Sequence, residues 1–148
     1  MPYRSSGQSI PAIGTDVPSL VLDTSAYSWL RSGDHQVMEL IAQAEVVLLP
    51  TIVLGELEAG FELGGRSREN RVVLGEFLAE PWVGVQAVTQ DVARRYGRIF
   101  ADLRRAGTPI PLNDVWIAAI TQQCSGHLLT YDGHFRSIGG LEVTVLGA

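Results

Sequence analysis

The chain of 148 residues has no lysine, a single cysteine and no long apolar run. The absence of lysine excludes the phosphate-binding loop of P-loop nucleotide-binding proteins, which requires one. The lone thiol of Cys124 cannot form an internal disulfide, which favours a reducing compartment, the cytoplasm. No segment approaches the ~20 apolar residues that cross a bilayer, and the N-terminus lacks the apolar stretch of a secretory signal, so we expect no contact with membranes.

Positive charge is scarce as well. The eleven basic residues are all arginines, and the formal net charge is -5. A protein of this charge has no general attraction for nucleic acid, so binding to RNA or DNA would require a local patch or bound cations.

Short apolar runs alternate with helical stretches from Ser19 onward. The residues before it are rich in glycine, proline and serine and show no periodicity, so we predict a flexible tail over 1–18 and a single domain over 19–148. Buried strands are predicted at 20–22, 46–49, 83–85, 127–130 and 141–145, and helices near 25–43, 51–63, 68–79, 89–106 and 114–124. This alternation predicts an α/β fold with three layers, α/β/α, around a central, mainly parallel sheet.

Acidic residues follow the predicted strands or open a predicted helix. Asp23 ends the apolar run 20–22, Asp132 lies just past the strand at 127–130, and Asp114 opens a helix. Each acid alone has an ordinary explanation, as a helix cap, a turn residue or a partner of the helix dipole, and Asn113 is the expected cap beside Asp114. In parallel sheets, however, ligands bind outside the carboxyl ends of the strands, which is where these acids lie.

Glu56 lacks such an ordinary explanation. On a helical wheel of 51–63 it falls among apolar and small residues, whereas Glu58 and Glu62 fall on the polar side. The wheel therefore predicts that Glu56 points inward. Because a buried carboxylate is costly, such a group is normally paired, protonated or bound to a metal, and no cationic partner shares its face.

Four short motifs carry a resemblance to a known family. They are L-V-L-D-T-S at 20–25, G-E-L at 55–57, P-L-N-D-V-W-I-A-A at 111–119 and L-L-T-Y-D-G-H-F at 128–135. In this order and spacing the chain resembles the PIN domain over about residues 19–146. More narrowly, it is similar to the VapC-type toxins of bacterial toxin–antitoxin pairs.

The resemblance implies an endoribonuclease that depends on magnesium or manganese and acts as the toxin of a type II pair, cleaving tRNA or rRNA to restrain translation and growth. It implies that Asp23, Glu56, Asp114 and Asp132 are the metal-binding and catalytic acids. Magnesium prefers oxygen ligands, and bound cations would offset the negative charge that otherwise repels an RNA backbone. Further residues are expected to orient the carboxylates or a water: Thr24, Ser25, Asn113 and Thr130.

The resemblance also implies partners. We expect an RNA substrate, a homodimer, and a VapB-like antitoxin encoded next to this chain that inserts a segment into the acidic cleft. Arg66, Arg68 and Arg71 follow the Glu56 helix and are candidates for RNA contact.

Two alternatives come from other classes. An aspartyl phosphotransferase of the haloacid-dehalogenase type also places an acid after its first strand, but it needs a second acid where this chain has Ser25, and a lysine. The other alternative is a catalytically silent PIN-like module that only binds a protein partner. Metal binding and RNA cleavage would separate this module from the enzyme.

Overall fold

The computed structural model describes residues 19–147, so the predicted tail over 1–18 lies outside the described residues. The strands are β1 (Ser19–Leu22), β2 (Val46–Pro50), β3 (Val83–Gln86), β4 (His127–Thr130) and β5 (Val143–Val145). The helices are α1 (Thr24–Arg31), α2 (His35–Gln43), α3 (Thr51–Leu63), α4 (Ser67–Leu78), α5 (Gln90–Ala106), α6 (Leu112–Gln123) and the short 3-10 helix η1 (Gly133–Ser137).

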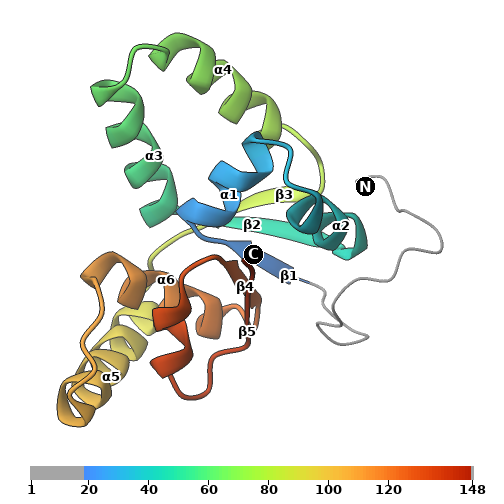
Figure 1. Cartoon of the computed structure of the whole chain (residues 1–148). Coiled ribbons are helices and arrows are strands. Elements are labelled where there is room, and N and C mark those ends of the chain that lie inside the picture. The colour runs from blue at the N-terminus through green and yellow to red at the C-terminus, as the bar shows by residue number, and fades with distance from the viewer. Residues whose placement is uncertain (1–18, 148) are drawn as a thin grey trace.

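The five strands form one parallel sheet in the order β3-β2-β1-β4-β5. Figure 1 shows α1 to α4 over one face of the sheet and α5 and α6 over the other. The prediction of three layers around a parallel sheet is therefore confirmed. None of the helices between residues 19 and 147 is both long and apolar enough to cross a membrane.

The central strand β1 is apolar because it is covered on both faces. Leu20, Val21 and Leu22 are fully buried, and the core continues into β4 through Leu128 and Leu129. Leu22 lies opposite Leu129 in the parallel register. Asp23 directly follows β1, and Thr130 is the last residue of β4. The two residues therefore lie side by side at the carboxyl edge of the sheet.

The predicted helix over 25–43 is wrong in one respect, because it is two helices. Gly33 adopts a left-handed φ of +80° between them, a conformation that glycine reaches without a steric penalty. Asp34 then caps α2 by accepting a hydrogen bond from the backbone N–H of Val37 at 3.2 Å. The Ser-Gly-Asp sequence at 32–34 ends one helix and caps the next. The apolar periodicity of the residues on either side suggested a single helix instead.

Gly126 leads into β4, where close packing leaves no room for a side chain. A Cβ atom there would lie 2.7 Å from Cγ2 of buried Val21 and 3.1 Å from Sγ of Cys124. We expect Gly126→Ala to lower the free energy of unfolding by about 1–3 kcal/mol through overpacking. Gly97→Ala in α5 is the control: no described atom lies within 4 Å of the new Cβ, and the change should raise stability by about 0.5–1 kcal/mol. Urea denaturation measures both, and equal effects would contradict this account of Gly126.

Candidate active site

An open cleft of about 480 Å³ lies at the carboxyl edge of the sheet. Its walls come from the junction of β1 with α1, from α3, from the start of α6 and from the segment after β4. The cleft is lined by Asp23, Thr24, Ser25, Glu56, Pro111, Leu112, Asn113, Asp114, Asp132 and His134. All four acids predicted from the sequence are thus brought into one cleft.

Asp23 is the most buried of these acids, with 2% of its surface exposed. It is the N-cap of α1, where Oδ1 accepts hydrogen bonds from the backbone N–H of Ala26 at 2.8 Å and from Oγ of Ser25 at 2.7 Å. Its other oxygen, Oδ2, accepts a hydrogen bond from Oγ1 of Thr130 at 2.5 Å. The ordinary explanation of Asp23 as a helix cap is correct, and the residue also lines the cleft.

Glu56 is half-buried at the edge of the cleft rather than inside the core. The buried stripe of α3 is Val53, Leu57 and Phe61, whereas Leu63, which the wheel placed beside Glu56, is 91% exposed. The prediction that Glu56 points into the apolar interior is therefore wrong. The wheel counted every apolar residue as buried, but the far end of α3 extends away from the sheet (Figure 1).

Two polar side chains hold Glu56 toward the cleft. Oγ1 of Thr24 donates a hydrogen bond to Oε1 at 2.6 Å, and Nδ2 of Asn113 donates one to Oε2 at 3.4 Å. Asn113 was expected to cap α6, but that helix begins two residues earlier, at Leu112, with Pro111 at the cap position and no side-chain cap. The amide of Asn113 is thereby free to reach Glu56.

Asp114 lies in the first turn of α6, where the helix dipole favours a negative charge. Its Oδ2 is 2.6 Å from Nε2 of His134, which comes from η1. When the carboxylate is ionised it can only accept, so Nε2 is then the donor. One oxygen from Asp114, one from Asp132 and a ring nitrogen of His134 all lie within 4.8 Å of one another, a spacing that could hold a cation.

His134 also lines the cleft and is not among the site residues predicted from the sequence. The signal was its place two residues after Asp132, in the segment that leaves β4. Asp132 itself is exposed, and its backbone N–H donates to Oγ1 of Thr130 at 3.0 Å. Thr130 therefore fixes both the Asp23 carboxylate and the backbone that presents Asp132 and His134.

Burial, together with neighbouring negative charge, disfavours the ionisation of two acids of the cleft, Asp23 and Asp114. Burial raises the pKa of Asp23 above its usual value against the opposing effect of its hydrogen bonds, and the charge of Asp132 raises it further. Burial also raises the pKa of Asp114, opposed by His134, and the charges of Asp132 and Glu56 add to the rise. The cleft is therefore a place where a bound cation would relieve an electrostatic cost.

The three candidate RNA-contacting arginines lie outside this cleft, near the turn between α3 and α4 (Figure 1). Arg71 forms ion pairs with Glu58 at 2.7 Å and Glu62 at 2.9 Å. Arg66 and Arg68 are exposed. Their contact with RNA stays a prediction, but Arg71 already has two carboxylate partners.

Comparison with known proteins gives one family and several similar structures. The family model described as the PIN domain matches residues 20–141. Ribonuclease VapC5 of Mycobacterium tuberculosis is 29% identical over 122 residues, which cover 81% of this chain and 87% of the relative.

Two solved toxin–antitoxin complexes share the fold. A member of the VapBC family of toxin–antitoxin systems from M. tuberculosis, VapBC-5, is 26% identical with a TM-score of 0.67, covering 88% of this chain and 99% of that chain. VapBC2 from Rickettsia felis, bound to a promoter DNA fragment, is 21% identical with a TM-score of 0.77, covering 87% and 99%.

Because burial raises the pKa of Asp23, its ionised form costs stability when no metal is bound. The folded state then holds the proton more tightly than the unfolded chain, so stability is lost as the pH rises from about 4, the usual value, through the raised pKa. Asp23→Asn should therefore raise the melting temperature of the metal-free protein, and by more at pH 7 than at pH 4. Thermal melts in EDTA test this.

The matched control is Asp102→Asn on α5, whose side chain is 69% exposed. It should change stability by no more than about 0.5 kcal/mol at either pH. The contrary outcome is a lower melting temperature of Asp23→Asn at pH 7, with that of Asp102→Asn unchanged. It would show that the hydrogen bonds of the Asp23 carboxylate stabilise the fold by more than its burial costs.

Proposed function

This chain belongs to the PIN domain family, and from that membership together with the acidic cleft we propose that it is a metal-dependent endoribonuclease, the toxin of a type II toxin–antitoxin pair. The observation that carries the proposal is the meeting of four carboxylates, from Asp23, Glu56, Asp114 and Asp132, in one cleft at the carboxyl edge of the sheet. The name of the relative ribonuclease VapC5 supports RNA as the substrate, and we propose tRNA or rRNA as its class.

The donor set of the cleft fits a hard divalent cation. Carboxylate oxygens are the ligands that Mg²⁺ and Mn²⁺ prefer. The described lining of the cleft contains no cysteine or methionine, whose sulfur atoms favour softer metals. Asp114 and Asp132 would hold the ion, with Asp23 and Glu56 binding directly or through water and His134 within reach. The ion would supply positive charge to the RNA phosphate and to the water that attacks it.

The residues of the chain itself orient these acids. Thr24 and Asn113 aim the Glu56 carboxylate into the cleft, and Ser25 and Thr130 fix both oxygens of Asp23. His134 restrains Asp114 from the opposite wall. Neutral donors hold a carboxylate in one orientation without cancelling its charge, which is the role outer hydrogen bonds play around bound metals.

The alternative of a silent binding module is less well supported. A module without catalysis would gain nothing from four acids in one cleft, two of which, Asp23 and Asp114, have their charged form disfavoured by burial. Its test is the same as that of the enzyme, because a silent module would leave RNA intact in the presence of metal.

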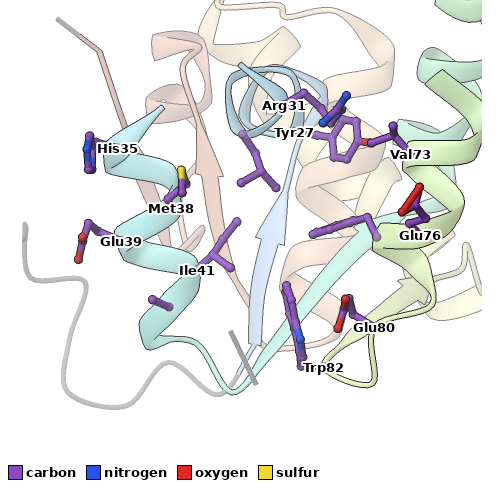
Figure 2. Close-up of a pocket in the computed structure, with 13 residues that line it drawn as sticks. Tyr27, Arg31, His35, Met38, Glu39, Ile41, Val73, Glu76, Glu80 and Trp82 are labelled. Carbon is purple, nitrogen blue, oxygen red and sulfur yellow. The ribbon is translucent and has the colours of Figure 1, made fainter. Parts of the chain in front are cut away.

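Besides the segment expected in the acidic cleft, we further propose that the protein partner, a VapB-like antitoxin, docks a second segment in an apolar groove of about 590 Å³ between α1, α2 and α4. Figure 2 shows Tyr27 and Trp82 in this groove, with Met38 and Glu39 on one side and Glu76 and Glu80 on the other. Tyr27 is 3% exposed, and its hydroxyl is the one buried side-chain polar atom without a hydrogen-bond partner in the part of the chain that the structure describes.

A buried hydroxyl without a partner costs about 1–3 kcal/mol, and a polar group of a docked segment could remove that cost. The three glutamates outnumber the one arginine of the rim, Arg31. The fitting occupant is an amphipathic segment with apolar side chains toward the aromatic floor and basic side chains over the glutamates. Homodimer formation and a cytoplasmic location stay part of this proposal as well.

The proposed chemistry predicts that RNA cleavage requires a metal and is lost when one carboxylate of the cleft is neutralised. Purified protein should cleave structured RNA with Mg²⁺ or Mn²⁺ and stop in EDTA, and Glu56→Gln or Asp114→Asn should reduce the rate at least about a hundredfold, the range typical of removing a group that stabilises developing charge. Gel assays of end-labelled RNA measure this.

The matched control is Glu58→Gln on the same helix, because Glu58 faces Arg71 and not the cleft. It should leave cleavage within about twofold of the wild type, since surface ion pairs contribute little. Saturating Mn²⁺ should raise the melting temperature of the wild type and of Glu58→Gln, and distinctly less that of Glu56→Gln. Cleavage that persists in EDTA would overturn the metal dependence.

If the antitoxin docks in the groove, substitutions there should prevent inhibition by the antitoxin and leave RNA cleavage unchanged. Glu76→Arg combined with Glu80→Arg should abolish the growth rescue that co-expression of the neighbouring protein gives, because the basic side chains would then meet arginines. RNA cleavage by the purified variant should stay at the wild-type rate.

Glu45→Arg combined with Asp102→Arg makes the same change in charge at exposed positions outside the groove. This control should keep the rescue. If both pairs abolish rescue, net charge and not the groove is responsible; if neither does, the antitoxin binds elsewhere.

A further inference from the structure

An exposed aromatic pair lies beside the cleft, and the chemistry proposed above does not use it. Trp29 on α1 is 48% exposed although its indole ring is stacked on Tyr131, with ring centroids 5.2 Å apart and an interplanar angle of 27°. Tyr131 is the residue between Thr130 and Asp132, so the stacked pair directly adjoins the acids.

Hydrogen bonds hold the Tyr131 ring and the backbone segments that carry both rings. The backbone N–H of Tyr131 donates to Oγ of Ser25 at 3.0 Å, and the same Ser25 hydroxyl donates to Asp23. The Tyr131 hydroxyl donates to the carboxylate of Asp34, whose backbone N–H in turn donates to the carbonyl of Trp29 at 3.0 Å. The pair is therefore a preorganised surface and not a loose side chain.

The helical spacing also places Trp29 close to a residue that lines the cleft. Ser25 lines the cleft, and Trp29 lies one helical turn further along α1 on the same face, about 6 Å away along the axis. Asp132 follows Tyr131 directly. A group that extends from a phosphate held in the cleft toward α1 would reach the free face of the Trp29 ring.

The surroundings favour an uncharged, flat ligand. Arg31 is two residues from Trp29 but lines the groove and not the cleft. The charged groups that bond to or directly follow Tyr131 are Asp34 and Asp132, which would repel a phosphate. A nucleobase is neutral and planar, and stacking on an aromatic ring needs no positive charge and tolerates any base. We propose that Trp29, backed by Tyr131, is a stacking platform for an unpaired base of the RNA, next to the phosphate held in the cleft; this rests on the proposed function.

The test combines a change in the protein with a change in the RNA. Trp29→Ala should raise KM for single-stranded RNA by roughly five- to hundredfold with kcat within about twofold, and Trp29→Phe should retain most of the affinity. An abasic nucleotide moved along the RNA should raise KM for the wild type at one position beside the cut. At that position it should have little further effect on Trp29→Ala, because the stacked base is already lost.

Val88→Ala is the control, since Val88 is also an exposed apolar side chain, at 41%, but lines neither the cleft nor the groove. It should leave KM unchanged. The platform is overturned if the effects of Trp29→Ala and the abasic nucleotide multiply independently, or if no abasic position raises KM for the wild type. It is also overturned if Trp29→Ala weakens only the binding of the neighbouring protein.

The abasic scan uses the wild-type protein, so it stays decisive even where Trp29→Ala does not fold. If the wild type cleaves no RNA with either metal, the proposed function fails and the platform with it. Cleavage without sensitivity to the base overturns the platform alone.

Discussion

The carboxylate of Asp23 joins the first helix, the end of β4 and the cleft. One of its oxygens caps α1, and the other accepts from Thr130 at the end of β4. These bonds offset the cost of burying a charge at the end of an apolar strand, which would be several kcal/mol without partners. The three donors, Ser25, the backbone N–H of Ala26 and Thr130, also fix the direction of the carboxylate. The residue that caps the helix is therefore also oriented as a candidate active-site acid.

The choice of partners explains why such a cleft can still receive a cation. In the described part of the chain, the side chains that bond to the cleft acids are hydroxyls, an amide and an imidazole. No ion pair between those acids and an arginine is found there. An arginine would occupy the carboxylate oxygens and cancel their charge. Hydroxyl and amide donors instead keep the negative charge in place. Burial raises the pKa of Asp23 and Asp114, and the hydrogen bonds to these carboxylates oppose that rise.

The sheet and the positions of Asp23, Asp114 and Asp132 could be predicted from the sequence because they depend on local signals. A short apolar run followed by an acid identifies a strand and its carboxyl edge, and all parallel strands end at the same edge. Glu56 was placed in the right cleft for an incorrect reason, since its burial depends on how far α3 extends past the sheet. His134 contacts Asp114 across twenty residues, and Asn113 reaches Glu56 only because α6 starts at Leu112. Such contacts depend on tertiary geometry that no local pattern encodes.

An acidic chain that binds RNA needs attractive contacts that do not rely on its own positive charge. The arginines nearest in sequence to Glu56 lie at the far end of α3, and Arg71 is already paired. The two proposals above supply such contacts near the acids: a cation for the phosphate and the Trp29 ring for an unpaired base. The hydrogen bonds of Ser25 and Thr130 tie the places of both to one edge of the sheet, because Ser25 bonds to Asp23 and to the Tyr131 backbone. The same few side chains thus position both the acids and the aromatic pair. A substitution of Ser25 would therefore disturb the Asp23 carboxylate and the Tyr131 backbone together.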